Sequence, residues 1–310
     1  MELLNIEDIN LLTPKTAVTV GMFDGLHVGH RHLVARLLEV AGSEKLKPVV
    51  VTFDRHPRQV LDPATPMALL STFDERLALL EECGVQTVVM VHFDAEKATL
   101  SACDFARRFL CNRLNMRILL LGYDNMFGSR RNNDFDQLPT LADELGFSIC
   151  RDEAVQVGGV EVSSTKIRKA LQRGDLAVAN AMLGAPYKVS GTVVHGRHVG
   201  TALGFPTANL LPADSAKMLP AAGVYALRAS VGGRSYAAMA NLGTQPTFHQ
   251  NQPVLEVHLL DFEGDIYGQQ LSVEFIDRIR DIRTFESPEA LALQLKDDRA
   301  VTYNLINKQL

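Results

Sequence analysis

The chain has 310 residues, of which 46% are hydrophobic and 22% are charged, a balance that excludes an intrinsically disordered protein. Its length is sufficient for about two domains. Its net charge of −5 argues against nucleic acid as a partner, because nucleic-acid-binding surfaces are usually basic. We find no apolar run of the roughly 20 residues that span a membrane and no basic leader at the start. The four cysteines form no C-x-x-C pair, so we expect reduced thiols in a cytoplasmic protein.

Residues 16–20 predict a β-strand, and an amphipathic helix follows the intervening segment GMFDGLHVGH, residues 21–30. We name this segment the glycine–histidine loop. A glycine turn that leads into a helix offers free backbone N–H groups and the positive end of the helix dipole, which together bind phosphate. His27 and His30 have no neighbouring serine or cysteine to activate. We therefore expect them to hold and neutralise a triphosphate while another group attacks.

Two other interpretations of the histidine pair are a metal site and ordinary polar surface. A metal site needs further ligands at workable spacing, and no cluster of Cys or His follows the pair. The flanking glycines have no role in such a site, whereas they allow a phosphate to approach the backbone closely. The loop resembles the H-x-G-H signature of the nucleotidylyltransferases. This resemblance implies ATP contacts from Gly21, Phe23, Gly25, His27 and His30.

Strand and helix signals alternate through the first half of the chain. Further strands are predicted at residues 49–53, 87–91, 118–121 and 147–150. Between them, Thr72 with Glu75 fits a capping box, and Ser101 with Asp104 marks another helix start. Strands that alternate with helices predict an α/β fold with a parallel, doubly wound, Rossmann-like sheet. Phosphate loops of such sheets lie at the carboxyl ends of the strands, where the glycine–histidine loop falls.

A second phosphate-binding signal is the run of hydroxyl groups on Ser163, Ser164 and Thr165, which opens a helix carrying Lys166 and Arg168. Hydroxyl side chains at a helix start are also ordinary N-caps, and the run alone does not decide between a cap and a site. Together with the first loop it resembles the S-S-T-x-I-R motif of the bacterial FMN adenylyltransferase module. This resemblance implies that Ser164, Thr165 and Arg168 bind the phosphates of ATP.

Two segments resemble further elements of the same module. TFDRHP at residues 52–57 is similar to its T-F-x-x-H-P element, and GYDNMFG at residues 122–128 to its G-x-[DN]-F-x-F-G element. Asn125 departs from the second pattern, because the family usually has an aromatic residue there. The resemblance implies flavin contacts from Phe53, Asp124 and Phe127, although a lone phenylalanine in an apolar run is more often part of the core.

The pattern changes after Gly184 and predicts two domains, residues 1–184 and 185–310. The later apolar runs are β-like and separated by turns, at residues 189–195, 224–230, 237–241, 255–260 and 271–280. Short strands with intervening turns predict a small antiparallel barrel or sandwich. A terminal helix begins with Ser287 as N-cap and Pro288 at the first helical position.

The second half also contains a glycine-rich stretch followed by PTAN, residues 206–209. Its glycines either mark turns and bulges or let backbone amides surround a diphosphate. Thr207 and Asn209 supply small oxygen donors, which Mg²⁺ prefers together with water and substrate phosphates. The stretch resembles the P-T-A-N signature of riboflavin kinase, except that Thr201 stands where the family commonly has arginine. The resemblance implies that Thr207 and Asn209 bind the metal, with ATP contacts from Gly196, Gly200, Gly204, Thr207, Asn209 and Asn241.

Glu256 lies in an alternating strand, and its neighbours Leu255 and Val257 should face the opposite side. A carboxylate on a strand face is usually solvated, and the residue alone predicts nothing more. The surrounding segment resembles a further riboflavin kinase element, which implies that Glu256 is the general base for the flavin hydroxyl. Phosphoryl transfer needs mainly alignment, metal charge and one proton acceptor, so the chemistry agrees with this role.

Over nearly the whole chain the motifs resemble, in order, those of the bacterial bifunctional riboflavin kinase/FMN adenylyltransferases. The resemblance implies phosphorylation of riboflavin to FMN by ATP, then adenylylation of FMN to FAD with release of pyrophosphate, and Mg²⁺ as cofactor. Expected partners are riboflavin, FMN and ATP, with no nucleic acid and no membrane, and homo-oligomerisation is left open. Two rivals are a flavin-binding protein that has lost catalysis and a nucleotidylyltransferase for another small phosphate, such as pantetheine phosphate.

Overall fold

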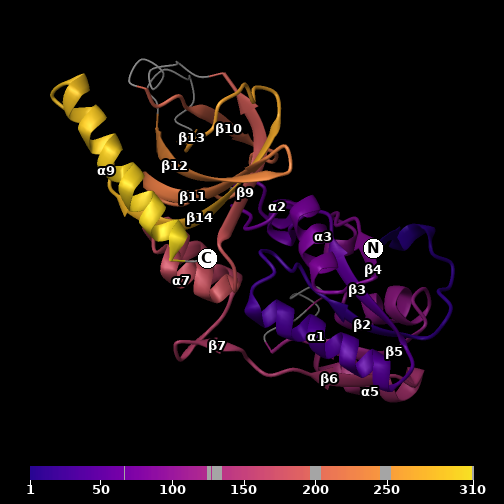
Figure 1. Ribbon diagram of the computed structural model, residues 1–310. Coiled ribbons are helices and arrows are strands. Elements are labelled where there is room, and N and C mark those ends of the chain that lie inside the picture. The colour runs from indigo at the N-terminus through magenta and orange to yellow at the C-terminus, as the bar shows by residue number, and fades with distance from the viewer. Residues whose placement is uncertain (66, 124–126, 128–134, 196–203, 245–252, 309–310) are drawn as a thin grey trace. The chain divides into compact units, whose positions relative to one another are not determined.

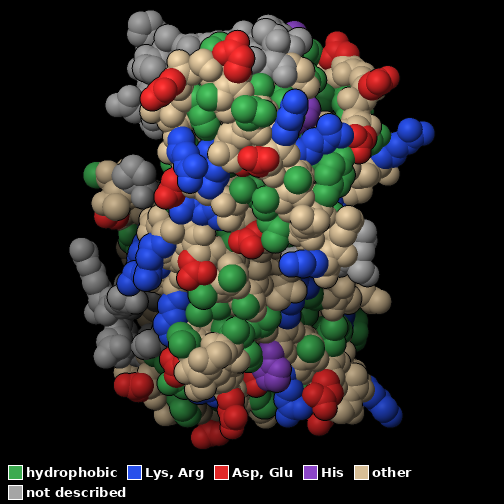
Figure 2. Space-filling view, turned by 60° about the vertical axis from the view of Figure 1, so that its left-hand side comes forward, with side chains coloured by type: hydrophobic (Ala, Val, Ile, Leu, Met, Phe, Trp, Pro, Cys, Tyr) green, Lys and Arg blue, Asp and Glu red, His purple; other side chains and the backbone are tan. Residues whose placement is uncertain are grey.

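The computed structural model describes residues 1–65, 67–123, 127, 135–195, 204–244 and 253–308. Contacts divide the chain into two units, Met1–Ser164 and Thr165–Leu310. Figure 1 shows a sheet with helices in the first unit and a barrel in the second. Lys and Arg side chains are interspersed with Asp and Glu side chains over the face shown in Figure 2. In the described part of the chain, no helix is long and apolar enough to cross a membrane.

The first unit is built on a six-stranded parallel sheet with the strand order β1-β4-β3-β2-β5-β6. Its strands are β1 (Glu2–Asn5), β2 (Thr16–Val20), β3 (Lys47–Phe53), β4 (Thr87–Val91), β5 (Met116–Leu121) and β6 (Ser148–Arg151). The sheet confirms the α/β fold predicted from the alternating pattern. β1 was not predicted, because its four residues at the sheet edge form too short a pattern to recognise.

Helices join these strands and cover both faces of the sheet. The α-helices are α1 (Val28–Ser43), α2 (Pro57–Leu61), α3 (Phe73–Glu82), α4 (Ala102–Phe105) and α5 (Leu138–Leu145). Short 3₁₀ helices are η1 (Ile6–Asp8), η2 (Lys97–Thr99) and η5 (Phe135–Gln137), and α4 continues into the π-helix η3 (Ala106–Cys111). A hairpin of β7 (Gln156–Val157) and β8 (Val160–Glu161) follows the last strand of the sheet. Both predicted helix starts are confirmed. Thr72 and Glu75 form a capping box, and Oγ of Ser101 accepts the Asp104 N–H at 3.0 Å.

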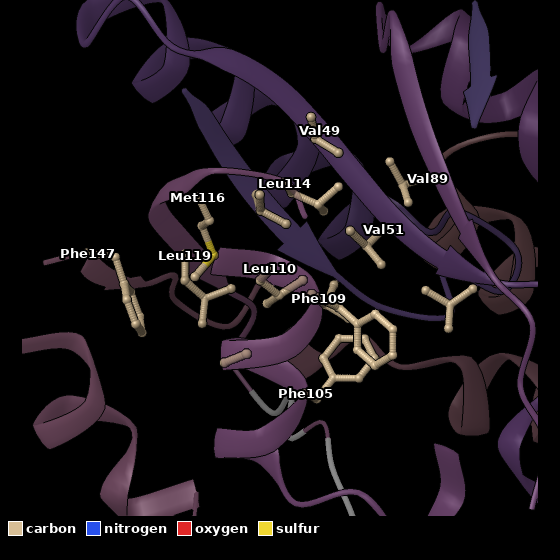
Figure 3. Close-up of a cluster of buried hydrophobic side chains, with 14 of the residues drawn as sticks. Val49, Val51, Val89, Phe105, Phe109, Leu110, Leu114, Met116, Leu119 and Phe147 are labelled. Carbon is tan, nitrogen blue, oxygen red and sulfur yellow. The ribbon is translucent and has the colours of Figure 1, made fainter. Parts of the chain in front are cut away.

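Two apolar clusters lie on opposite faces of the sheet, because successive side chains of a strand point in opposite directions. Val49 and Val51 belong to one cluster, and Val50 belongs to the other. Figure 3 shows the first cluster, in which Val51 lies nearer than Val49 to the rings of Phe105 and Phe109. The second cluster packs α1 and α3 against the other face. The same face therefore supports α3 and, through Phe23 and Leu26, the glycine–histidine loop.

The second unit contains a closed antiparallel barrel with the strand order β10-β13-β12-β11-β14-β9. Its strands are β9 (Tyr187–Val194), β10 (Ala208–Pro212), β11 (Gly223–Val231), β12 (Arg234–Thr244), β13 (Pro253–Leu259) and β14 (Gln270–Arg280). Closure decides between the two predicted alternatives, barrel and sandwich. β10 was not predicted as a strand. It begins inside the PTAN segment and pairs with β9 and β13.

Helices α6 (Ser164–Arg173, from Thr165 on), α7 (Leu176–Leu183) and α9 (Pro288–Asn307) belong to the barrel unit. Nδ2 of Asn180 on α7 donates to the Phe275 carbonyl at 2.9 Å, and its Oδ1 accepts the Tyr187 N–H at 2.8 Å. α9 packs against β11, β12 and β14 (Figure 1), and Ser287 caps it as predicted. The expected boundary between residues 184 and 185 concerns independent folding and stays a prediction.

Candidate active sites

The glycine–histidine loop joins the carboxyl end of β2 to the start of α1 and has an irregular backbone. Phe23, Gly25 and Leu26 have positive φ angles of 50°, 78° and 37°, a conformation that glycine adopts readily and other residues adopt at a cost. His27 is the N-cap of α1, and its Nδ1 accepts the backbone N–H of His30 at 3.3 Å. The loop therefore delivers both histidines to the first turn of a helix.

The two imidazole rings stack on each other, with ring centroids 3.6 Å apart and planes inclined by 15°. Gly29 allows this arrangement, because a Cβ there would lie 3.2 Å from Nδ1 of His27. Nδ1 of His30 is buried and has no hydrogen-bond partner among the residues that the structure describes. Burial lowers the pKa of His30 well below its ordinary value, and repulsion from His27 and Arg76 lowers it further. His30 is therefore neutral near pH 7.

Asp24 anchors the loop, although the sequence analysis gave it no role. It is 1% exposed, and its carboxylate accepts the backbone N–H groups of Leu70 at 3.2 Å and Ser71 at 2.9 Å. Oγ of Ser71 in turn accepts the Gly25 N–H at 2.9 Å. The signal in the sequence was an acidic residue inside an otherwise small and apolar turn. Its contacts hold the loop in one conformation before a ligand arrives.

Ser164 contacts the same loop. Its Oγ donates to the Asp24 carbonyl at 3.0 Å, so the start of the S-S-T motif lies beside the glycine–histidine loop within the first unit. Thr165 is exposed and Arg168 is half-buried, and both are carried by α6 as part of the second unit. The contacts of Thr165 and Arg168 with ATP stay predictions.

Phe53 and Phe127 belong to one group of phenylalanine rings in the first unit. The ring centroid of Phe105 lies 6.3 Å from that of Phe53 and 5.7 Å from that of Phe127. Phe93 adds an edge-to-face contact with Phe53 at 5.4 Å. Phe53 is part of the core cluster, and Phe127 packs against it while remaining partly accessible. The structure thus brings the two predicted residues together and adds Phe93 and Phe105, which the sequence analysis did not single out.

Three polar residues from distant parts of the sequence lie side by side on the barrel. Asn209 of β10 and Asn241 of β12 are the cross-strand neighbours of Glu256 on β13. Nδ2 of Asn241 donates to Oε2 of Glu256 at 3.3 Å. Leu255 and Val257 are fully buried, which confirms the predicted alternation along this strand. We name Asn209, Glu256 and Asn241 the polar row.

A cavity of about 280 Å³ opens beside the polar row in the second unit. Thr207, Asn241 and Glu256 line its polar part. The rest of the wall is largely apolar and comes from the barrel and from α9, including Phe205, Val224, Met239, Leu291 and Leu295. Small-molecule sites typically combine such an apolar wall with a few polar groups at one end. The arrangement suits a planar apolar ring with a polar chain.

His258 and Arg280 also line this cavity, and the sequence analysis singled out neither. Nδ1 of His258 lies 2.6 Å from the Pro206 carbonyl oxygen and donates to it, while burial lowers the pKa of His258. Its signal was the spacing of two residues from Glu256, which places both on one strand face. Arg280 binds the carboxylate of Asp298 on α9 through Nε at 3.0 Å and Nη2 at 2.7 Å.

Five positions considered in the sequence analysis lie outside the described residues: Asp124, Asn125, Gly196, Gly200 and Thr201. Gly204 lies within them and has a φ of 78°, a left-handed conformation that glycine adopts without strain. It forms part of the turn that leads into the PTAN segment.

Known proteins match both halves of the chain. The FAD synthetase family model matches residues 10–166, and the riboflavin kinase family model matches residues 183–306. The bifunctional riboflavin kinase/FMN adenylyltransferase of Escherichia coli (strain K12) is 38% identical over 282 residues, which are 91% of this chain and 90% of that protein. The corresponding protein of Bacillus subtilis (strain 168) is 32% identical over 290 residues, with coverages of 92% and 90%.

A crystal structure from Streptococcus pneumoniae, described as a macrolide-efflux protein, has the same fold. It superposes with a TM-score of 0.88 and 34% sequence identity, and the match covers 98% of this chain and 99% of that one. The two family models and the coverage of the curated relatives agree with each other. The chain belongs to the family of bifunctional riboflavin kinase/FMN adenylyltransferases.

Proposed function

We propose that the protein makes FMN at the polar row and cavity of the second unit and makes FAD at the glycine–histidine loop of the first. The two activities, riboflavin phosphorylation and FMN adenylylation, are those of its family, and each uses ATP. The observation that carries the assignment is the polar row. Glu256 is a carboxylate at the edge of a cavity, and a neighbouring amide restrains its rotation.

In the kinase step, Glu256 accepts the proton of the riboflavin 5′-hydroxyl. The hydroxyl oxygen bonds to the γ-phosphorus of ATP, and the bond from that phosphorus to the β-phosphate oxygen breaks to release ADP. Thr207 and Asn209 offer hard oxygen donors just before and within β10, a donor set that fits Mg²⁺. When bound there with ATP, the metal offsets negative charge on the phosphates. Asn241 holds the Glu256 carboxylate in place through Oε2.

The flavin ring is proposed to occupy the apolar part of the cavity. Met239 of the barrel and Leu291 and Leu295 of α9 provide a wall against which a flat ring can be buried. The ribityl chain then extends to the polar row, where its terminal hydroxyl meets Glu256. Gly204 and the amide of Asn241 would lie on the nucleotide side of this site.

In the adenylyltransferase step, a phosphate oxygen of FMN bonds to the α-phosphorus of ATP. The bond from that phosphorus to the β-phosphate oxygen breaks, and pyrophosphate leaves. The reaction needs no protein nucleophile, so the task of the site is to stabilise charge on the phosphates. His27, His30 and the backbone from Gly21 to Gly25 would do this at the start of α1, together with Ser164, which contacts the loop. The family motif adds Thr165 and Arg168 as proposed phosphate contacts, and Phe53 and Phe127 would contact the flavin.

The test is to incubate riboflavin, ATP and Mg²⁺ with the wild type, His30→Ala and Glu256→Gln, and to separate FMN from FAD by chromatography. We expect the wild type to form both, His30→Ala to stop at FMN, and Glu256→Gln to make almost no FMN but to convert supplied FMN to FAD. Loss of both activities in either folded variant contradicts the assignment to two sites. If the wild type binds flavin but forms no product, it is a flavin-binding protein that has lost catalysis. If it adenylylates only pantetheine phosphate, it is a nucleotidylyltransferase for another small phosphate.

A further inference from the structure

The largest fully buried side chain of the described residues is a charged one, Arg76 on α3. It is 1% exposed, and its Nη1 donates to Oγ1 of Thr52 at 3.0 Å and to the Phe53 carbonyl at 2.7 Å. Nε of Arg76 is buried, and the described residues offer it neither a hydrogen-bond acceptor nor an ion pair. The guanidinium group is therefore held at the carboxyl end of β3 and is only partly satisfied by the protein.

Packing alone does not account for this side chain. Burying a cation without a close anion is unfavourable, and an apolar side chain of similar volume would fill the space without that penalty. Burial lowers the pKa of Arg76, and the charges of the Asp24 and Asp54 carboxylates oppose this effect. An arginine nevertheless keeps its proton in proteins, so the site holds a permanent positive charge. A local cost that the fold does not require points to a role in function.

Thr52 links Arg76 to the glycine–histidine loop. Oγ1 of Thr52 accepts from Arg76 and donates to the Met22 carbonyl at 3.4 Å, and Thr52 itself is fully buried. The charge of Arg76 also acts on His30. Among the described residues, the charges of His27, from the loop itself, and Arg76, from α3, lower the pKa of His30. Arg76 is therefore linked to the loop backbone through Thr52 and acts electrostatically on His30.

We propose that Arg76 is a positioning residue for FMN adenylylation: held by β3, it fixes the glycine–histidine loop through Thr52 and keeps a permanent positive charge near His30. The inference rests on the proposed location of the adenylyltransferase site at this loop. Backbone N–H groups that are fixed in advance bind developing phosphate charge without reorganisation. A neutral His30 gains a proton more easily once ATP brings negative charge into the site. The charge of Arg76 would therefore keep His30 neutral in the free enzyme, so that it becomes protonated only when ATP is bound.

The experiment compares Arg76→Met, Arg76→Lys and Thr52→Val in the full chain, with Thr72→Ala as matched control. Thr72→Ala removes the N-cap of the same helix and loosens α3 without touching the guanidinium contacts. FAD formation from FMN is measured with kcat and KM separated, and riboflavin phosphorylation in the same samples reports on the second unit. We expect kcat for FAD formation to fall about 10²-fold in Arg76→Met and about 10-fold in Thr52→Val. Arg76→Lys should recover part of the loss, and Thr72→Ala should keep the wild-type kcat.

The NMR titration of the His30 ring adds a readout that a merely structural role would not move. Its midpoint should rise toward the ordinary histidine value in Arg76→Met and stay unchanged in Thr52→Val and Thr72→Ala. An unmoved midpoint together with wild-type kcat in Arg76→Met would overturn the inference, and so would an equal loss of kcat in Thr72→Ala. Should Arg76→Met fail to fold, Thr52→Val decides, because it keeps the shape and removes only the hydroxyl.

His30→Ala separates this inference from the proposed function. If His30→Ala forms FAD normally, the adenylyltransferase site does not lie at the loop, and the proposed role of Arg76 is wrong as well. If His30→Ala forms no FAD while Arg76→Met forms it normally, the site lies at the loop and only the proposed role of Arg76 is wrong.

Discussion

Replacing Glu256 by Gln tests the kinase site most directly. The amide oxygen of Gln can still accept from Nδ2 of Asn241, which lies 3.3 Å from Oε2 in the wild type, so the polar row should keep its geometry. The amide cannot accept a proton, however. General-base catalysis contributes roughly 10²–10⁴-fold to rate, and we expect riboflavin phosphorylation to fall by a factor in this range. That loss corresponds to about 2.7–5.5 kcal/mol of transition-state stabilisation.

The assay measures FMN formation with riboflavin and ATP varied separately, together with calorimetric binding of Mg·ATP. Glu256→Gln should lower kcat and leave the Kd for Mg·ATP unchanged, because the substitution removes no proposed metal ligand. Asn209→Ala is the matched comparison from the same row, and it should raise this Kd as well as lower turnover. Conversion of supplied FMN to FAD should be nearly unaffected in both. Near-normal FMN formation by Glu256→Gln would refute the general-base role and leave alignment and metal charge to explain the kinase step.

Asp298 is 1% exposed and binds Arg280 beside the cavity. Asp298→Ala should therefore lower the free energy of unfolding of the second unit, measured in urea, by about 3–5 kcal/mol. It should also raise the KM for riboflavin more than the KM for ATP. An unchanged unfolding midpoint would contradict a stabilising role of the Arg280–Asp298 pair. Asp298→Asn should lose less stability than Asp298→Ala. His30 is neutral when folded and binds a proton below about pH 6.5 when unfolded. The stability of the first unit should therefore fall as pH drops below that value, by at most about 1.4 kcal/mol per pH unit. Hydrogen exchange of α1 measures this slope, and a slope that persists in His30→Asn would refute its origin in His30. The fragment Thr165–Leu310 should fold and make FMN but no FAD. The fragment 186–310 should do the same with lower stability, because it lacks the contacts of Asn180 with Phe275 and Tyr187. Absence of FMN from both folded fragments would place the kinase site elsewhere.

Local signals were sufficient for the fold class and for the starts of several elements. The capping box of Thr72 and the N-cap of Ser287 were recognisable because a cap depends on residues only three or four positions apart. The order of strand, glycine turn and helix located the glycine–histidine loop for the same reason. Alternation along β13 placed Glu256 opposite the buried Leu255 and Val257 without any knowledge of the neighbouring strands.

Only the tertiary structure decided which distant residues meet. The closure of the barrel, the existence of β10 and the polar row all depend on the register of Asn209 and Asn241 against Glu256. In sequence, Arg76 is an ordinary charged residue of a helix, and its burial is evident only once α3 packs against β3. A periodic pattern specifies which side of a strand or helix faces inward, because that depends on neighbours in the chain. It does not specify which element lies opposite, because pairing and register are settled by the packing of the whole unit.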